Sequence, residues 1–148
     1  MASIHKILLH HTETEPPRAV ESALITPTGG IDGDSHAAGR EHRRVLATDL
    51  EVLGTMGLSP GDLREQITIT GMQVDSLDEG AFLQIGSARA KVLGPCAPCL
   101  TIGSYLGVAD VESFRDQMTD RRGRFLLFEG SDGVEISVGD EVSLLPQQ

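Results

Sequence analysis

The stretch AFLQIGSARAKVL, residues 81–93, indicates the fold class of this sequence most directly. Two short runs rich in apolar residues, Ala81–Ile85 and Ala88–Leu93, flank Gly86. A glycine between two such runs is typical of a tight turn that joins neighbouring strands. We therefore expect two β-strands connected by a turn at this point of the chain.

Short segments of the same kind recur along the sequence. Gln66–Thr70 reads QITIT and alternates isoleucine with polar residues, which is typical of a half-buried strand. A turn through residues 131–133, with the sequence SDG, separates Phe125–Phe128 from Val134–Val138 and predicts a hairpin. The remaining expected strands are Ile4–His10, Arg18–Thr26, Val45–Thr48 and Glu141–Leu145.

Two helices are expected among these strands. One covers about Asp49–Met56, with Asp49 or Thr48 as its N-cap, because a short polar side chain can accept the first free N–H groups of a helix. The other covers about Val111–Thr119, with Asp110 as its cap. Many short strands with few helices predict a mainly β fold, a closed or partly closed β-barrel with a few short helices.

Composition agrees with this architecture. The chain has 148 residues, about the usual size of one domain, so we expect a single domain over residues 1–148. It contains 17 glycines and only 3% aromatic residues, which favours short elements joined by tight turns. The formal net charge of −10 argues against general affinity for nucleic acid or anionic membranes, because both require a basic surface.

The sequence also predicts a compartment. Residues 1–15 contain no apolar stretch of signal-peptide length, and no run approaches the roughly 18 apolar residues of a membrane span. We therefore expect a cytoplasmic protein in which both cysteines, Cys96 and Cys99, are reduced.

Arginines are concentrated in two parts of this acidic chain. Such islands could form a local anion-binding site, and ordinary solvated arginines are the alternative interpretation. The islands are Arg40, Arg43, Arg44 and Arg64 in the centre, and Arg121, Arg122 and Arg124 nearer the C-terminus.

The motif Cys96-Ala-Pro-Cys99 is the first candidate for chemistry. Zinc needs four ligands and the chain has only these two cysteines, while a dithiol redox motif would precede a long helix. Two buried, inert thiols are a further alternative. If Pro98 starts a helical turn, Cys99 lies in its first turn, where the helix dipole favours the thiolate.

Two further motifs hold polar residues in glycine-rich segments. Residues 29–36, GGIDGDSH, place Asp34 and His36 two positions apart, where they could orient a ligand or move a proton. A plain turn, with Asp34 bonded to its own backbone, is the alternative. Residues 60–67, PGDLREQI, place Arg64 between a turn and a strand.

These motifs together resemble the MOSC domain family, which is named after the C-terminal domain of molybdenum cofactor sulfurase. The resemblance lies in the order and spacing of the blocks and covers nearly the whole chain. In one position the sequence departs from the family, because Gln66 stands where the family usually has Asn. The matching blocks are Gly30–His36, Arg44-Val45, Glu51, Pro60–Ile67, Gly71, Leu77–Gly80, Leu83–Gly86, Pro95–Cys99 and Gly139-Asp140.

The resemblance implies a MOSC-like β-barrel and sulfur or molybdenum-cofactor chemistry. It implies that Cys99 is a persulfide carrier or a molybdenum ligand, with Cys96 as a resolving or packed thiol. It places the other candidates around Cys99, with His36 and Asp34 as further catalytic residues. The candidate cofactor-binding residues are Arg44, Arg64, Gln66 and Gly33.

Three functions follow as hypotheses from this resemblance and from the residues. The first is sulfur transfer through a Cys99 persulfide in molybdenum-cofactor or metal-sulfur metabolism, with a cysteine desulfurase-like donor or a molybdoenzyme as partner. Pyridoxal phosphate would then belong to the separate donor, because this chain is too short to hold a desulfurase domain. The second is an oxidoreductase of the amidoxime-reducing type that binds the molybdenum cofactor (molybdopterin). The third is a non-catalytic module that binds an anion.

Overall fold

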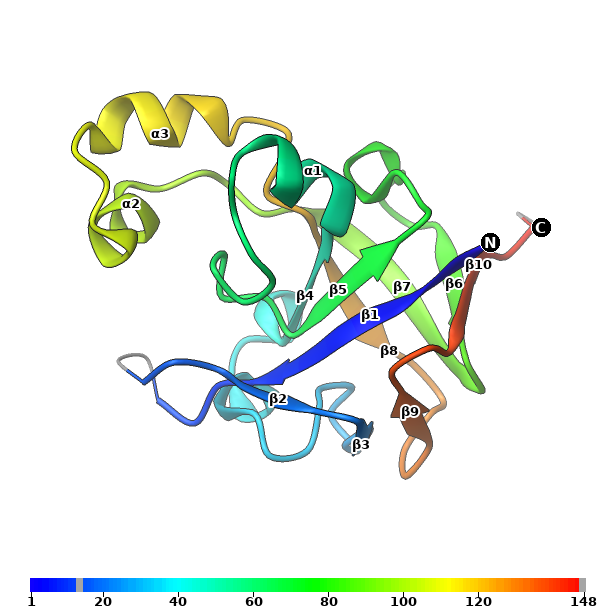
Figure 1. Cartoon of the computed structure of the whole chain (residues 1–148). Coiled ribbons are helices and arrows are strands. Elements are labelled where there is room, and N and C mark those ends of the chain that lie inside the picture. The colour runs from blue at the N-terminus through cyan, green and yellow to red at the C-terminus, as the bar shows by residue number, and fades with distance from the viewer. Residues whose placement is uncertain (13–14, 147–148) are drawn as a thin grey trace.

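The computed structural model describes residues 1–12 and 15–146, and its main feature is a β-barrel (Figure 1). Seven strands close the barrel in the order β10-β6-β7-β8-β4-β5-β1, because β1 also pairs with β10. A further strand, β2, pairs with β1, and β3 pairs with β9 in a separate two-stranded sheet. The strands are β1 Ala2–Leu9, β2 Arg18–Val20, β3 Ser22–Leu24, β4 Val45–Asp49, β5 Ile67–Thr70, β6 Phe82–Ile85, β7 Ala88–Pro95, β8 Arg124–Phe128, β9 Glu135–Ser137 and β10 Glu141–Leu144.

The predicted mainly β class and the barrel are confirmed. Helices are few and short, and the two that the sequence predicted are present. Asp49 caps α1 by accepting from the backbone of its first turn, and Asp110 caps α3 in the same way. The helices are α1 Leu50–Thr55, α2 Leu100–Leu106 and α3 Val111–Gln117, with 3₁₀ turns η1 Ser35–Ala38, η2 Glu41–Arg43 and η3 Val74–Ser76.

The turn at Gly86 joins β6 and β7 as predicted, with Ile85 opposite Ala88 in an antiparallel pair. The expected strand over Arg18–Thr26 is wrong in one respect, because it is divided into β2 and β3. The division lies at Glu21, where the chain leaves the barrel strand β1 and begins to pair with β9. Alternation in the sequence does not indicate that a strand changes partners.

The hairpin predicted through residues 131–133 is wrong. The turn itself forms, since Val134 N donates to Ser131 O at 2.9 Å. However, β8 pairs with β4 on one side and β7 on the other, so both of its edges are occupied. The following strand β9 therefore pairs with β3.

Two apolar clusters support this arrangement. The barrel interior contains the inward residues of its strands, among them Val45 and Ala47 of β4. A second cluster joins α1, α2 and α3 at one side of the barrel, where Figure 1 shows α2 and α3 extending outward. The second cluster consists of Leu53, Leu63, Ile102, Phe114 and Met118.

No helix within residues 1–12 and 15–146 combines the length and apolarity that a bilayer crossing needs.

Candidate functional site

A small pocket lies on the outer face of the barrel over β4 and β8. Val45 and Ala47 face the core, so Leu46 between them faces outward, because successive side chains of a strand alternate. Its neighbour across the strand pair is Phe125. Together they border a pocket of about 90 Å³, which we call the arginine pocket. The lining residues are His36, Arg43, Leu46, Leu63, Arg64, Gln66, Cys96, Arg122 and Phe125.

The charge of the arginine pocket is opposite to that of the chain as a whole. Three arginine residues line it, and its lining includes no acidic residue, whereas the whole chain carries a net charge of −10. Within residues 1–12 and 15–146, the ion pairs involve none of these three arginines. A pocket of this kind favours an anion, because guanidinium forks match the oxygens of phosphate, sulfate and related groups.

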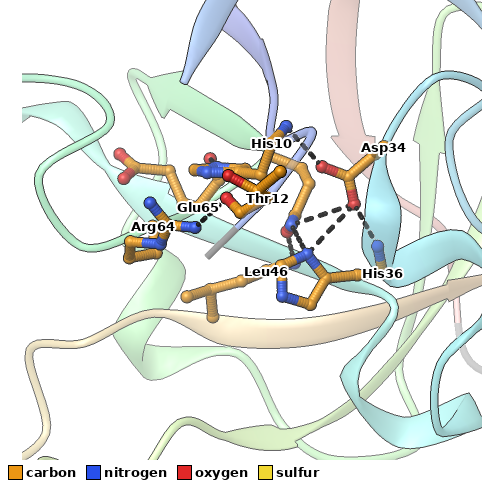
Figure 2. Close-up of polar contacts among 8 residues, drawn as sticks. His10, Thr12, Asp34, His36, Leu46, Arg64 and Glu65 are labelled. Carbon is orange, nitrogen blue, oxygen red and sulfur yellow. Dashed lines mark hydrogen bonds and ion pairs between the residues drawn. The ribbon is translucent and has the colours of Figure 1, made fainter. Parts of the chain in front are cut away.

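Asp34 lies next to the pocket residue His36 and is the centre of a hydrogen-bond network, which Figure 2 shows. Its side chain is buried and accepts hydrogen bonds from His10 N at 2.8 Å and His36 N at 3.0 Å. Its Oδ2 also lies 3.2 Å from His36 Nδ1. Burial alone would raise the pKa of Asp34, but the hydrogen bonds from His36 and His10 outweigh it and lower the pKa. Asp34 is therefore an ionised anchor that holds the imidazole of His36.

Gln66 completes this network. Its Oε1 accepts from Leu46 N at 2.7 Å, so its Nε2 faces Asp34 Oδ2 at 3.3 Å and His36 Nδ1 at 3.2 Å. Ionised Asp34 is only an acceptor, so His36 Nδ1 donates to it, and the Gln66 amide then donates to Asp34 Oδ2 and not to His36. His36 lines the pocket, and Asp34 and Gln66 determine its orientation. The amide that departs from the family pattern thus has a defined role in this chain.

Arg64 is held in a strained conformation at the pocket edge. Its φ of 62° is left-handed, which is uncommon for any residue other than glycine. Its guanidinium donates to Thr12 O at 2.9 Å and Glu15 O at 3.2 Å, and lies 5.3 Å from the ring centroid of Tyr105. Arg64 therefore joins the segment after β1 to helix α2.

A larger cavity of about 630 Å³ adjoins the arginine pocket. The two cavities share Arg43 and Phe125, whose guanidinium and ring centroid are 5.6 Å apart. Cavities of this size hold cofactors and other organic ligands in many proteins. The lining of the larger cavity is Glu41, His42, Arg43, Glu79, Leu93, Gly94, Pro95, Ala97 and Phe125.

The two thiols have different surroundings. Cys96 is 5% exposed and lines the arginine pocket, and burial raises its pKa in spite of the charges of Arg122 and Arg43. Cys99 is half-buried and precedes α2 as its N-cap residue. Burial acts to raise the pKa of Cys99, but the N–H of Ile102 and the charge of Arg122 lower it overall.

Arg122 connects Cys99 with the arginine pocket. Its Nη1 lies 3.7 Å from Cys99 Sγ and donates to Ala97 O at 2.9 Å. The residue is 7% exposed and lines the pocket, and its buried Nε has no hydrogen-bond partner in the described part of the chain. A buried donor without a partner is costly, so this geometry is suited to an acceptor supplied by a ligand.

The structure brings together some of the predicted site residues but not all. His36, Arg64 and Gln66 line the arginine pocket, and Asp34 contacts His36. Cys99 is not part of the pocket lining but contacts Arg122, which is. Cys99 also packs against the second apolar cluster.

Two predicted cofactor-binding residues lie outside the pocket. Arg44 donates to Gly39 O at 3.1 Å and Thr28 O at 2.6 Å, so its guanidinium stabilises the loops before β4. Gly33 adopts a φ of 88° in the turn before Asp34 and is absent from the pocket lining.

Sequence reasoning did not assign Arg43 and Arg122 to the site. Both belong to the two arginine islands, which were the available signal. Arg43 and Arg122 are almost eighty positions apart, so the sequence does not show that η2 and the segment before β8 meet over β4 and β8. In the described part of the chain, no group of three or more His, Cys, Asp or Glu side chains could hold a metal ion. A metal at Cys99 would therefore need other ligands from a cofactor.

The fold and the site define a β-barrel protein with a cationic pocket and a thiol, Cys99, in contact with one of the arginines that line it. The MOSC domain model matches residues 26–143, and the chain belongs to this family. A search of curated protein sequences finds no significant match.

Solved structures show the same fold at low sequence identity. YuaD from Bacillus subtilis has a TM-score of 0.81 at 19% identity, over 100% of this chain and 98% of that one. YiiM from Escherichia coli has a TM-score of 0.72 at 14% identity, covering 100% of this chain and 71% of that one. YiiM from Geobacillus stearothermophilus has a TM-score of 0.73 at 15% identity, covering 99% and 76%.

Proposed function

We propose that this chain is a cytoplasmic sulfur-transfer protein in which Cys99 carries sulfur as a persulfide. The observation that carries the proposal is the contact of 3.7 Å between Arg122 Nη1 and Cys99 Sγ at the edge of the arginine pocket. A guanidinium beside a half-exposed sulfur stabilises the thiolate, which is the nucleophilic form. The lowered pKa of Cys99 supports the same assignment.

The transfer needs a donor persulfide on a separate protein, such as a cysteine desulfurase. The Cys99 thiolate attacks the outer sulfur of the donor persulfide and forms a new S–S bond. The S–S bond in the donor breaks, and its electron pair stays on the donor thiolate. No oxidant is consumed, and Cys99 now holds one sulfane sulfur beside Arg122.

Mass spectrometry after incubation with cysteine and a cysteine desulfurase tests this proposal. Cys99 should gain the mass of one sulfur atom, and a thiol reductant should remove it. Cys96→Ser should gain as much sulfur as the natural chain, because burial raises the pKa of the Cys96 thiol, whereas Cys99→Ser should gain none. Loading of Cys96 alone, or of neither thiol, would contradict the proposal.

Binding of the molybdenum cofactor is the second candidate, and the cavity of about 630 Å³ favours it. The residues fit such a group: Arg43 and Arg122 could hold a phosphate, and thiolate is a soft ligand for molybdenum. When bound, the cofactor would supply redox chemistry at the metal. The chain's own residues would bind the phosphate, provide the sulfur of Cys99 and hold a proton at His36.

Metal analysis distinguishes the second candidate from the first. Protein produced in a host that makes the cofactor should retain molybdenum through purification, and Cys99→Ala should lose it. A metal-free protein that still loads sulfur on Cys99 would support sulfur transfer alone. Anion binding that survives Cys99→Ser without either activity would indicate a non-catalytic binding module.

A further inference from the structure

We propose that the arginine pocket binds a small sulfur oxyanion, sulfite, as the acceptor of the sulfur carried by Cys99. This inference rests on the sulfur-transfer function proposed above and specifies its acceptor. It places the acceptor in a pocket next to the thiol, with Arg122 between the two.

The size and the charge of the pocket define the acceptor class. At about 90 Å³, the pocket is much smaller than the adjoining cavity of about 630 Å³. A four-atom oxyanion fits that space, whereas an organic cofactor requires a larger cavity. Arg43, Arg64 and Arg122 line the pocket without a neutralising carboxylate, which favours a dianion over a monoanion or a neutral acceptor.

The pocket also contains the donors that an oxyanion requires. The buried Nε of Arg122 has no hydrogen-bond partner among residues 1–12 and 15–146, and an anion oxygen would supply one. Arg43 contacts the Phe125 ring and lines both cavities where they adjoin.

The chemistry of the carried sulfur selects sulfite among small dianions. An acceptor of sulfane sulfur must bring a nucleophilic lone pair, which sulfite has on its sulfur and which phosphate and sulfate lack. A persulfide on Cys99 extends about 2 Å beyond the thiol sulfur, the length of an S–S bond. Because Arg122 both contacts Cys99 and lines the pocket, the outer sulfur and the bound anion share one guanidinium.

The step is balanced without an external oxidant or reductant. The sulfur lone pair of sulfite attacks the outer sulfur of the persulfide and forms the S–S bond of thiosulfate. The bond between this sulfur and Cys99 Sγ breaks, and its electron pair stays on Cys99 as the thiolate. Arg122 stabilises that leaving thiolate, and Cys99 is ready to accept another sulfur.

Single-turnover transfer to sulfite tests the inference. The full chain is loaded with labelled sulfur from cysteine and a desulfurase, desalted, and mixed with increasing sulfite, and thiosulfate is measured. Transfer is expressed per sulfur loaded on Cys99, and on that scale Arg43→Gln should need at least about tenfold more sulfite for half-maximal transfer, the effect expected for losing one charge-assisted hydrogen bond. Arg43→Lys keeps the positive charge but not the planar guanidinium, so the sulfite concentration that it needs for half-maximal transfer should lie between those of Arg43→Gln and the natural chain.

Arg40→Gln is the matched control. Arg40 is exposed, lies in the same arginine island and is not part of the pocket lining, so its removal should leave the sulfite dependence unchanged. The acceptor assignment alone would be overturned if the loaded protein kept its sulfur in the presence of sulfite. It would also be overturned if Arg43→Gln and Arg40→Gln needed the same sulfite concentration for half-maximal transfer. A Cys99 that gains no sulfur before sulfite is added would instead refute the sulfur-transfer function and this inference together.

Discussion

At the scale of single residues, the two thiols differ in burial and in their contact with Arg122. Cys96 and Cys99 are three positions apart, but burial raises the pKa of the first thiol, while the second has a lowered pKa. The contact with Arg122 is specific to Cys99 Sγ. Cys-x-x-Cys spacing alone does not distinguish the two thiols, because it contains no information about burial or about an arginine from another part of the chain.

Replacement of Arg122 should therefore make Cys99 less reactive. In a Cys96→Ser background, Arg122→Gln should raise the pKa of Cys99 and slow its alkylation at neutral pH severalfold, because a neighbouring positive charge favours the thiolate. The pH dependence of the iodoacetamide reaction measures this change. Arg121→Gln, at the exposed neighbouring position, is the control and should behave like the background protein. An unchanged alkylation profile in Arg122→Gln would show that the guanidinium does not activate the thiol.

At the scale of elements, Asp34 connects three segments that meet beside the pocket. It accepts from the backbone at the end of β1, caps η1 and accepts from Gln66 just before β5. The sequence alone suggested both a turn with Asp34 bonded to its own backbone and a pair between Asp34 and His36. The structure contains both the turn and the side-chain contact, because η1 places the N–H and the imidazole of His36 on the same carboxylate oxygen.

This network predicts a pH dependence of stability. The pKa of Asp34 is lower in the folded chain than in the unfolded one, so its contribution is complete above the unfolded value of about 3.9. That contribution is lost as the pH falls through the folded pKa. Asp34→Asn should lower the free energy of unfolding at pH 7 by about 1–3 kcal/mol.

Urea unfolding between pH 3 and pH 7 tests this prediction. The difference between the natural chain and Asp34→Asn should be largest near neutral pH and should shrink at the acidic end. Asp32→Asn, at an exposed position in the same segment, is the matched control. A difference that stayed constant over the whole range would mean that ionisation of Asp34 does not stabilise the fold.

At the scale of the whole molecule, closure of the barrel fixes which positions are interior. β10 pairs with both β6 and β1, so the last strand completes the ring that the first strand begins. Leu83 and Leu144 are register partners across the β6–β10 pair, yet Leu83 is fully buried and Leu144 is 55% exposed. The same residue type at neighbouring positions therefore makes very different contributions to stability.

A pair of leucine substitutions tests this difference. Leu83→Ala should destabilise the chain by about 2–5 kcal/mol, because it removes a buried side chain and leaves a cavity in the barrel interior. Leu144→Ala should change the free energy of unfolding by less than about 0.5 kcal/mol. Thermal or urea unfolding compares the two variants directly. Similar losses for both would show that β10 is not seated in the barrel as described.

The sequence by itself determined the class of the fold and most of its elements. Alternation and glycine turns predicted the strands and the β6–β7 turn, and capping residues predicted α1 and α3, because these signals act over neighbouring residues. The motif order pointed to the MOSC family and to Cys99, His36 and Arg64 as site residues.

Only the tertiary structure decided which distant segments meet. It separated β8 from β9, since both edges of β8 were already paired, and it gave Arg44 a role in loop packing. It also brought Arg43 and Arg122 from separate islands to one pocket over β4 and β8. Strand pairing and the convergence of side chains depend on contacts between residues far apart in the chain, which local sequence patterns do not specify.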